Sequence, residues 1–388
     1  MRILHTADWH IGQRLHERQR LDEHKEFLNW LLDTIQEHKV ELLLVSGDIF
    51  DTSLPSAEAT KLYYEFLFRL YDETEAYTVI IAGNHDSSRH LEAPKEFLKM
   101  GRIYVVGQAT KPKDCVIQIP PEKPQVSVAA VPYLSENELK PVSFESEMEK
   151  NERYRERLKA FYTDCVSHMP DKLPKILMGH LYVNGGKVGD SERNIQIGGA
   201  TAIHTNDFPE DVDYIALGHL HRPQNIKGQD YPILYAGSPI PLRFNESNYR
   251  KNVFLIELSD GKLDRCDKVK IPIFKELCSI EGNENEILSQ AMTEDWDSKY
   301  IQVKLKLDSI RTGISDEIRA AFSDRGGDVL TVEVELPQDE SRPIIQLEDM
   351  KRPEQIFKQF HQTKFGSPPD ESLTQTFSEL IQIVEGTQ

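Results

Sequence analysis

The chain has 388 residues, of which 39% are hydrophobic and 28% charged, a composition typical of a globular protein with about two or three domains. Its net charge of −18 argues against a protein that coats nucleic acid by bulk positive charge, although bound cations or a partner could supply that charge. No apolar run reaches the ~20 residues of a membrane helix, and MRILHTADWH lacks the apolar region of a signal peptide, so we expect a cytoplasmic protein without membrane contact.

The first hundred residues predict alternating strands and helices. Short apolar runs at 2–8, 41–48 and 77–86 are typical of buried strands, and apolar residues recur at helical spacing in 21–39 and 56–73. This order predicts an α/β domain whose sheet faces are covered by helices. The second helix is apolar almost all round, which predicts that it is internal or covered by another chain.

Four later apolar runs, at 126–133, 175–181, 213–221 and 231–239, predict the other strands of a larger sheet system. Beyond residue 274 the pattern changes. Residues 299–308 and 329–337 alternate apolar with polar side chains, and a helical segment at 314–322 lies between them. This alternation predicts a small α+β domain with one solvated sheet face. We therefore expect a first domain over 1–275, a small domain over 276–337 and a tail over 338–388.

The tail predicts two amphipathic helices, which either dock on a partner or pack back on the body. The first carries Ile356, Phe357 and Phe360. The apolar positions of the second are Leu373, Phe377, Leu380, Ile381 and Val384. No P-loop is present, and no G-x-G-x-x-G follows a strand, so we expect no nucleotide-binding site in this chain.

Five of the predicted strands end in carboxylate, amide or imidazole side chains, and four of these turns carry a nearby glycine. Because ligands gather beyond the carboxyl ends of strands in open α/β sheets, we expect these side chains to converge in space. In chain order they are Asp8 and His10, then Asp48, then Asn84 and His85, then His180, and finally His219 and His221. A single such end, GNHD for example, could equally be an ordinary turn, but five in one chain are hard to produce by chance.

The donor types indicate the kind of site. Aspartate, asparagine and histidine together suit Mn²⁺, Fe²⁺ or Zn²⁺, whereas Mg²⁺ and Ca²⁺ favour oxygen. Even seven of these eight side chains are too many ligands for one tetrahedral ion, and they suit two. Asp48 stands alone on a central strand and is the natural carboxylate to bridge a metal pair. His219 and His221 lie on the same side of an extended backbone, where they serve one ion or are split between two.

The motifs D-x-H, G-D, G-N-H-D, G-H and G-H-x-H, in this order, resemble those of the calcineurin-like metallophosphoesterase superfamily. Within it, HTADWHIG, SGDIFD, GNHDSS, GGKVGDSERNIQIGG, DYIALGHLHRPQ and YAGSPIPLRFNE are similar to the SbcD-like family of double-strand-break repair nucleases. The motif resemblance covers about residues 1–250. It implies an αββα sandwich with a small α+β capping domain and a helical C-terminal tail.

The resemblance also implies a role for each site residue. Two divalent ions, Mn²⁺ with Mg²⁺ a poor substitute, would share the bridging Asp48. One ion would be held by Asp8, His10, Asp48 and His221, and the other by Asp48, Asn84, His180 and His219. His85 would face the scissile phosphate and assist transfer to the leaving oxygen without binding metal. Asp86 would orient a neighbouring group.

The same resemblance implies a DNA nuclease: an ATP-independent single-strand endonuclease and an ATP-dependent 3′–5′ duplex exonuclease. Such an enzyme cleaves hairpins and processes DNA ends in repair, recombination and replication. The tail would dock on an SbcC-type SMC/Rad50-like ATPase, and the helix at 61–71 would form a homodimeric bundle, giving a heterotetramer that is nucleoid-associated when on DNA.

Two other functions compete with this interpretation. The metal site alone also suits a phosphatase or a small-molecule phosphodiesterase, although the cap, the tail and the SbcD-like segments argue against them. A scaffold that only tethers the ATPase would be expected to have lost ligands, whereas here every motif position is filled.

Overall fold

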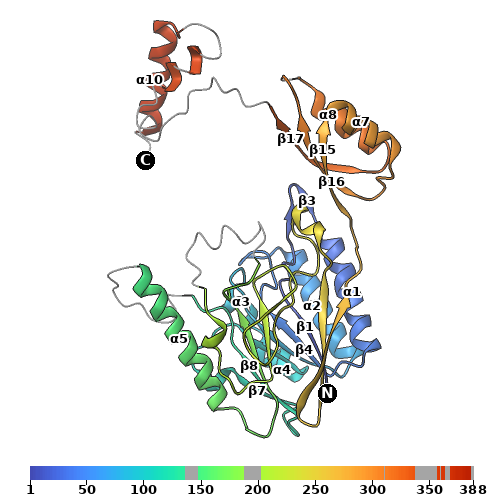
Figure 1. Cartoon of the computed structure of the whole chain (residues 1–388), viewed down its shortest axis with the longest axis vertical. Coiled ribbons are helices and arrows are strands. Elements are labelled where there is room, and N and C mark those ends of the chain that lie inside the picture. The colour runs from blue at the N-terminus through green and yellow to red at the C-terminus, as the bar shows by residue number, and fades with distance from the viewer. Residues whose placement is uncertain are drawn as a thin grey trace. The chain divides into compact units, whose positions relative to one another are not determined.

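The computed structural model describes residues 1–135, 147–187, 202–309, 311–336, 356–358, 360–362 and 368–385 (Figure 1). The chain divides into two compact units, Met1–Leu305 with Thr312–Glu333, and Lys306–Arg311 with Val334–Gln388. Within the described parts, no helix is long and apolar enough to cross a bilayer.

The body is built on two six-stranded sheets. The first has the order β14 (Lys262–Lys270), β13 (Asn252–Ser259), β1 (Arg2–Thr6), β4 (Leu42–Ser46), β5 (Tyr77–Ile81) and β6 (Ile103–Val106). The second has the order β11 (Gln224–Ile226), β12 (Ile233–Tyr235), β10 (Tyr214–Gly218), β9 (Lys175–His180), β8 (Val126–Ala130) and β7 (Val116–Ile119). The central strands of both are parallel, so their carboxyl ends share one edge.

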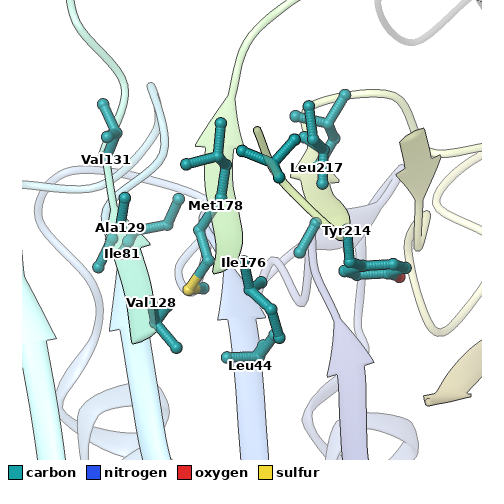
Figure 2. Packing of buried hydrophobic residues seen from close by; sticks show 14 of the residues in the cluster. Leu44, Ile81, Val128, Ala129, Val131, Ile176, Met178, Tyr214 and Leu217 are labelled. Carbon is teal, nitrogen blue, oxygen red and sulfur yellow. The ribbon is translucent and has the colours of Figure 1, made fainter. Parts of the chain in front are cut away.

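The two sheets pack face to face, because alternate residues of each strand point to opposite sides. On β4, Leu42 and Leu44 lie in the core between the sheets, whereas Leu43 and Val45 point outward to the helices. Figure 2 shows Leu44 with residues of the second sheet such as Ile176 and Met178. Burial on both faces is why these strands are continuous apolar runs in the sequence.

Helices cover the outer face of each sheet, which completes an αββα sandwich. Against the first sheet lie α1 (Leu21–Glu37), α2 (Ala57–Glu73), α3 (Ser88–Glu92) and α4 (Lys95–Met100). Against the second lies α5 (Glu147–Ser167), whose Tyr162 hydroxyl donates to Met178 O at 3.4 Å. The short elements are a β2–β3 hairpin (Arg14–Leu15 and Arg18–Gln19) and the 3₁₀ turns η1 (Pro112–Cys115), η2 (Thr205–Asp207) and η3 (Phe244–Asn248).

The small α+β fold is present as predicted, in β15 (Leu277–Asn283), β16 (Tyr300–Lys306), β17 (Asp328–Glu335), α7 (Glu284–Thr293) and α8 (Ile314–Ser323). Its Ile301, Val303 and Leu305 are fully buried, which confirms the alternation of β16. The domain limits 1–275, 276–337 and 338–388 stay a prediction. Of the two tail helices, α10 (Glu371–Glu385) is described, and only a few residues of the first lie inside the described ranges.

Candidate metal centre

The eight predicted site residues gather at one edge of the sandwich. They follow or end β1, β4 and β5 of the first sheet and β9 and β10 of the second, so the carboxyl ends of five parallel strands supply them. The metal-ligand candidates Asp8, His10, Asp48, His180, His219 and His221 are buried, whereas Asn84 and His85 are partly exposed. The structure thus brings together residues that span more than two hundred positions of the chain.

The backbone after these strands turns sharply. Asp8, His10, Asp48 and His219 have φ values of 52°, 47°, 51° and 99°, in the left-handed region that non-glycine residues seldom adopt. Hydrogen bonds from Asp8 N to Gly47 O and from His10 N to Asp48 O, both 3.0 Å, join the loops after β1 and β4. The loops after β1 and β4 are therefore held together at the positions that carry Asp8, His10 and Asp48.

Glycine is required where two of these loops touch. A methyl group on Gly83 would overlap Asp48 Oδ1 and the Asp48 backbone nitrogen. Gly47 has φ +86°, and a methyl group there would overlap the His180 ring. The glycines of the G-D and G-N-H-D motifs thus let three loops approach closely enough to share one site.

One group of four donors lies on the side of the second sheet. His180 Nε2 is 3.0 Å from Asn84 Oδ1 and 3.3 Å from Asp48 Oδ2. His219 Nδ1 is also 3.0 Å from Asn84 Oδ1. The His180 ring is oriented by a 2.9 Å hydrogen bond from Nδ1 to Ser46 O, which leaves Nε2 facing the other donors. These four side chains form the set expected around one ion.

A second group shares Asp48. Ligand atoms of Asp8, His10 and Asp48 lie within 4.8 Å of one another, and His10 Nε2 is 3.5 Å from Asp48 Oδ2. The His10 and His221 rings are 5.0 Å apart. Asp8 Oδ2 and His10 Nε2 are buried without a hydrogen-bond partner. Buried polar atoms normally find a partner, so these orphaned donors fit a bound cation.

The electrostatics of the cluster agree with a cation site. Burial by itself would raise the pKa of Asp48, but the neighbouring His180, His10 and His85 hold it well below its ordinary value. Burial would lower the pKa of His180, yet Asp48 and Asp8 raise it to about 9. The carboxylates therefore draw positive charge into a buried place, as a metal centre must.

His85 stands beside these donors and is held from two directions. Its backbone N–H donates to Asp48 Oδ1 at 2.9 Å, and its ring Nδ1 lies 2.8 Å from Asp51 O. Because a carbonyl oxygen can only accept, Nδ1 carries a proton and Nε2 is the nitrogen left for a substrate. The His85 and His10 rings meet edge to face at 4.8 Å.

Asp86 joins the loops after β4 and β5. Its carboxylate accepts from the backbone N–H groups of Gly83, Ile49 and Phe50 at 2.8, 3.1 and 2.9 Å. These bonds fix the loop that carries Asp48 against the loop that carries Asn84 and His85. The predicted orienting role of Asp86 thus has a concrete geometry, directed at backbone groups.

Sequence reasoning missed three residues at the site. Asp51 Oδ1 lies 3.3 Å from His10 Nδ1, and its carbonyl orients His85. Glu246 and Lys251 form a buried ion pair next to His221. Asp51 ends the G-D-I-F-D motif, and Glu246 ends the segment YAGSPIPLRFNE, so both lie within motifs that the sequence itself makes recognisable.

A cleft of about 770 Å³ opens from the donors. His10, Asp51, His85 and His221 line one part of it. Its walls include three cationic side chains: Arg14 of the β2–β3 hairpin, Arg243 before η3, and Lys304 of β16. Two carboxylates, Asp51 and Glu333, also line the cleft, so the cations outnumber them by three to two. In a chain of net charge −18, this local excess of cations suits an anionic ligand.

Comparisons with known proteins point the same way. The family description "Calcineurin-like phosphoesterase" matches residues 1–223. The SbcD subunit of the nuclease SbcCD from Bacillus subtilis (strain 168) is 31% identical over 390 residues, which cover 99% of each chain. Its counterpart from Escherichia coli (strain K12) is 35% identical over 307 residues, covering 76% of this chain and 74% of that one. A solved dimetal phosphatase from Danio rerio has 13% sequence identity and a TM-score of 0.41, over 70% of this chain and 98% of that one.

Proposed function

The chain belongs to the calcineurin-like phosphoesterase family, and from this premise we propose that it is the nuclease subunit of an SbcCD-like complex, hydrolysing phosphodiester bonds in DNA. The observation that carries the proposal is the convergence of two overlapping donor groups on Asp48, beside His85, at the end of a cationic cleft. One relative named as a nuclease subunit matches over 99% of the chain, and therefore along its small domain and tail as well.

We assign one divalent ion to Asp8, His10, Asp48 and His221, and the other to Asp48, Asn84, His180 and His219. The mixed nitrogen and oxygen donors favour Mn²⁺ over Mg²⁺. When bound, the two ions would supply Lewis acidity toward the phosphate and an activated water. The chain's own contribution is to hold the ligands, orient the phosphodiester and manage the proton of the leaving group.

We assign the handling of that proton to His85. Its Nδ1–H is fixed on Asp51 O, so the ring cannot turn without losing a 2.8 Å hydrogen bond. Because Nδ1 is occupied by this bond, Nε2 is the ring nitrogen that remains for the substrate. A protonated Nε2 donates to a phosphate oxygen or to the departing sugar oxygen, which stabilises the transition state.

The cleft favours a polynucleotide over a small phosphodiester. Arg14, Arg243 and Lys304 come from three separate parts of the chain and line the same cleft as His85. One phosphate at the metal centre would not use all three cations, whereas a strand with flanking phosphates would. Lys304 lies on the predicted capping domain, so that domain contributes to the substrate surface.

The partner proposals rest on exposed apolar surface. Phe68 and Tyr71 of α2 are 65% and 46% exposed, which suits a homodimer formed through this helix. Leu373 and Leu380 of α10 are 41% and 55% exposed and lie seven positions apart, on one side of the helix. We assign this stripe to docking on the SMC/Rad50-like ATPase.

The function is tested by incubating the purified chain with end-labelled linear duplex, single-stranded and hairpin DNA and Mn²⁺, with and without a chelator. We expect chelator-sensitive label release, and stronger release from duplex ends when the ATPase and ATP are added. A chain carrying both Leu373→Glu and Leu380→Glu should keep the basal activity and lose the stimulation by the ATPase, because only its docking stripe is changed.

The competing function is a phosphatase or small-molecule phosphodiesterase. Bis(p-nitrophenyl) phosphate, hydrolysed through the same ions, serves as the reference substrate. Hydrolysis of this ester with no degradation of any DNA, even with the ATPase present, would contradict the nuclease proposal and support the competing function. Failure to hydrolyse either substrate with Mn²⁺ would contradict both.

A further inference from the structure

The segment that follows β12, from Gly237 to Lys251, has no part in the metal ligation assigned above, yet it encloses one ligand. It passes through η3 and ends just before β13. Glu246 on η3 and Lys251 are 1% and 6% exposed, which is unusual for charged residues unless they are paired. Their side chains meet at 2.7 Å, between Lys251 Nζ and Glu246 Oε2.

The two carboxylate oxygens of Glu246 have different tasks. Oε2 accepts from Lys251 Nζ, from Ser238 Oγ at 3.3 Å and from Leu242 N at 3.2 Å, so the carboxylate is anchored on that side. Oε1 lies 3.3 Å from His221 Nδ1. Because a carboxylate only accepts, this contact places the proton on Nδ1 and leaves His221 Nε2 as the metal-binding nitrogen.

Lys251 holds the same histidine by its backbone. Its ammonium donates to His221 O at 3.2 Å and to Ser238 Oγ at 2.7 Å, besides Glu246. Ser238 N also donates to His221 O at 3.1 Å. The buried Glu246–Lys251 ion pair therefore fixes both the ring and the backbone carbonyl of His221.

The other metal position has separate supports. The His180 ring is oriented by a hydrogen bond to Ser46 O at 2.9 Å, and the His180 and His219 rings both face Asn84 Oδ1 at 3.0 Å. None of these contacts involves the Gly237–Lys251 segment. A change at Glu246 should therefore act on the ligand set that contains His221 and spare the set that contains His180 and His219.

We propose that Glu246 and Lys251 form a clamp on His221 that sets the affinity of one metal position, the one held by Asp8, His10, Asp48 and His221, independently of the other. Glu246 is a positioning residue, because it acts through His221. The inference rests on the two-metal centre of the proposed function. Partners of this kind typically change metal affinity about 10- to 100-fold.

The test is a Mn²⁺ titration of the metal-stripped full chain, in which free Mn²⁺ is followed by electron paramagnetic resonance. The wild-type chain should bind two ions. Glu246→Gln, which keeps an acceptor but loses the charge, should bind one ion normally and the other about 10-fold more weakly. The double variant Glu246→Leu/Lys251→Met should weaken that same ion by about 100-fold, because the imidazole loses its acceptor.

The double variant also guards against misfolding, because replacing a buried ion pair by apolar residues of similar size leaves no unpaired charge. Lys175→Met is the matched control: Lys175 is buried too and pairs with Asp171 and Asp211, but it lies at the opposite end of the β9 strand. It should bind both ions normally.

The proposal of a clamp would be wrong if the Glu246 variants bound both ions with wild-type affinity, or if the affinities for both ions fell equally. If the wild-type chain binds fewer than two ions, the two-metal centre itself is wrong and the clamp fails with it.

Discussion

Four of the site residues have a left-handed backbone conformation: Asp8, His10, Asp48 and His219. Such conformations cost on the order of 1 kcal/mol each and persist only where the surrounding structure enforces them. Here the enforcing contacts are the hydrogen bonds between neighbouring loops and the carboxylate of Asp86, which binds three backbone N–H groups. The strain is concentrated where the donors converge, which is the pattern expected of a functional site.

The role of His85 in catalysis can be tested separately from metal binding by the residues around it. Its ring is fixed on Asp51 O and its Nε2 is left for the substrate, so His85→Ala should reduce DNA hydrolysis by about 10²- to 10⁴-fold, the usual contribution of a general acid. Mn²⁺ stoichiometry should stay at the wild-type value, because the ring is assigned to neither ion. Initial rates on labelled DNA and metal content after gel filtration are the two measurements.

His90→Ala is the matched control for this change. His90 is an exposed histidine on α3, only five positions further along the chain, and it does not line the cleft. We expect it to leave rate and metal content unchanged. Loss of metal in His85→Ala would mean that His85 is a ligand, and the assigned role would be wrong.

At the scale of elements, much of the fold could be predicted from the sequence. Seven strands of the two sheets, β1, β4, β5, β8, β9, β10 and β12, were recognisable because burial on both faces makes them continuous apolar runs, whereas β6, β7, β11, β13 and β14 were not predicted. The position of the site followed from parallel topology, since polar residues after five such strands must share one edge. Metal-ligand roles stay a prediction.

Other elements gave no such signal. The edge strand β14 (Lys262–Lys270) is largely polar, and the long α5 has few apolar positions, because each contacts the body on one side only. The Glu246 contact with His221 depends on a loop returning from 25 positions away, which no local pattern encodes. The left-handed turns likewise arise from contacts between loops and are invisible in residue types alone.

The exposed apolar face of helix α2 is the predicted contact of the homodimer. One face buries Tyr63, Phe66 and Leu67 in the body, whereas Phe68 and Tyr71 remain exposed on the other. Covering an exposed Phe or Tyr by a second copy would stabilise a dimer by about 2 kcal/mol for each side chain. Phe68→Glu should therefore shift the wild-type dimer to a monomer of 44.6 kDa in sedimentation experiments at micromolar concentration.

Met292→Glu provides the comparison for this prediction. Met292 is an apolar side chain of α7 with an exposed fraction of 63%, close to that of Phe68. The same charge placed there should not change the mass of the particle. A wild-type chain that sediments as a monomer, or a dimer that survives Phe68→Glu, would contradict the assignment of α2.

At the scale of the whole molecule, His5 joins the two sheets through their apolar interface. The Ser46 hydroxyl donates to Ala216 O at 3.1 Å, so it accepts from His5 Nε2–H at 3.2 Å. The Tyr214 hydroxyl then donates to His5 Nδ1 at 2.8 Å. His5 and Ser46 belong to the first sheet, and Tyr214 and Ala216 to the second, so a neutral imidazole completes a polar bridge across the sandwich.

This bridge predicts a sensitivity of folding to acid. Burial lowers the pKa of His5 to about 3, whereas the unfolded chain has the ordinary value of about 6.5. Between these values the unfolded state binds the extra proton, so the free energy of unfolding falls as pH decreases below about 6.5. The free energy of unfolding falls by about 1.4 kcal/mol for each pH unit below about 6.5, so His5 accounts for a loss of about 2 kcal/mol at pH 5.

Urea unfolding of the wild-type chain and of His5→Gln at pH 7.5 and pH 5 measures this contribution. Glutamine offers a donor and an acceptor but does not titrate, so the variant should be less stable at pH 7.5 yet lose about 2 kcal/mol less on acidification. His168→Gln, at an exposed position, should lose as much as the wild type. Equal losses in wild type and His5→Gln would show that His5 does not couple the sheets to pH, and the acid sensitivity of the sandwich would then have to come from other buried groups such as His24, whose pKa burial lowers to about 4.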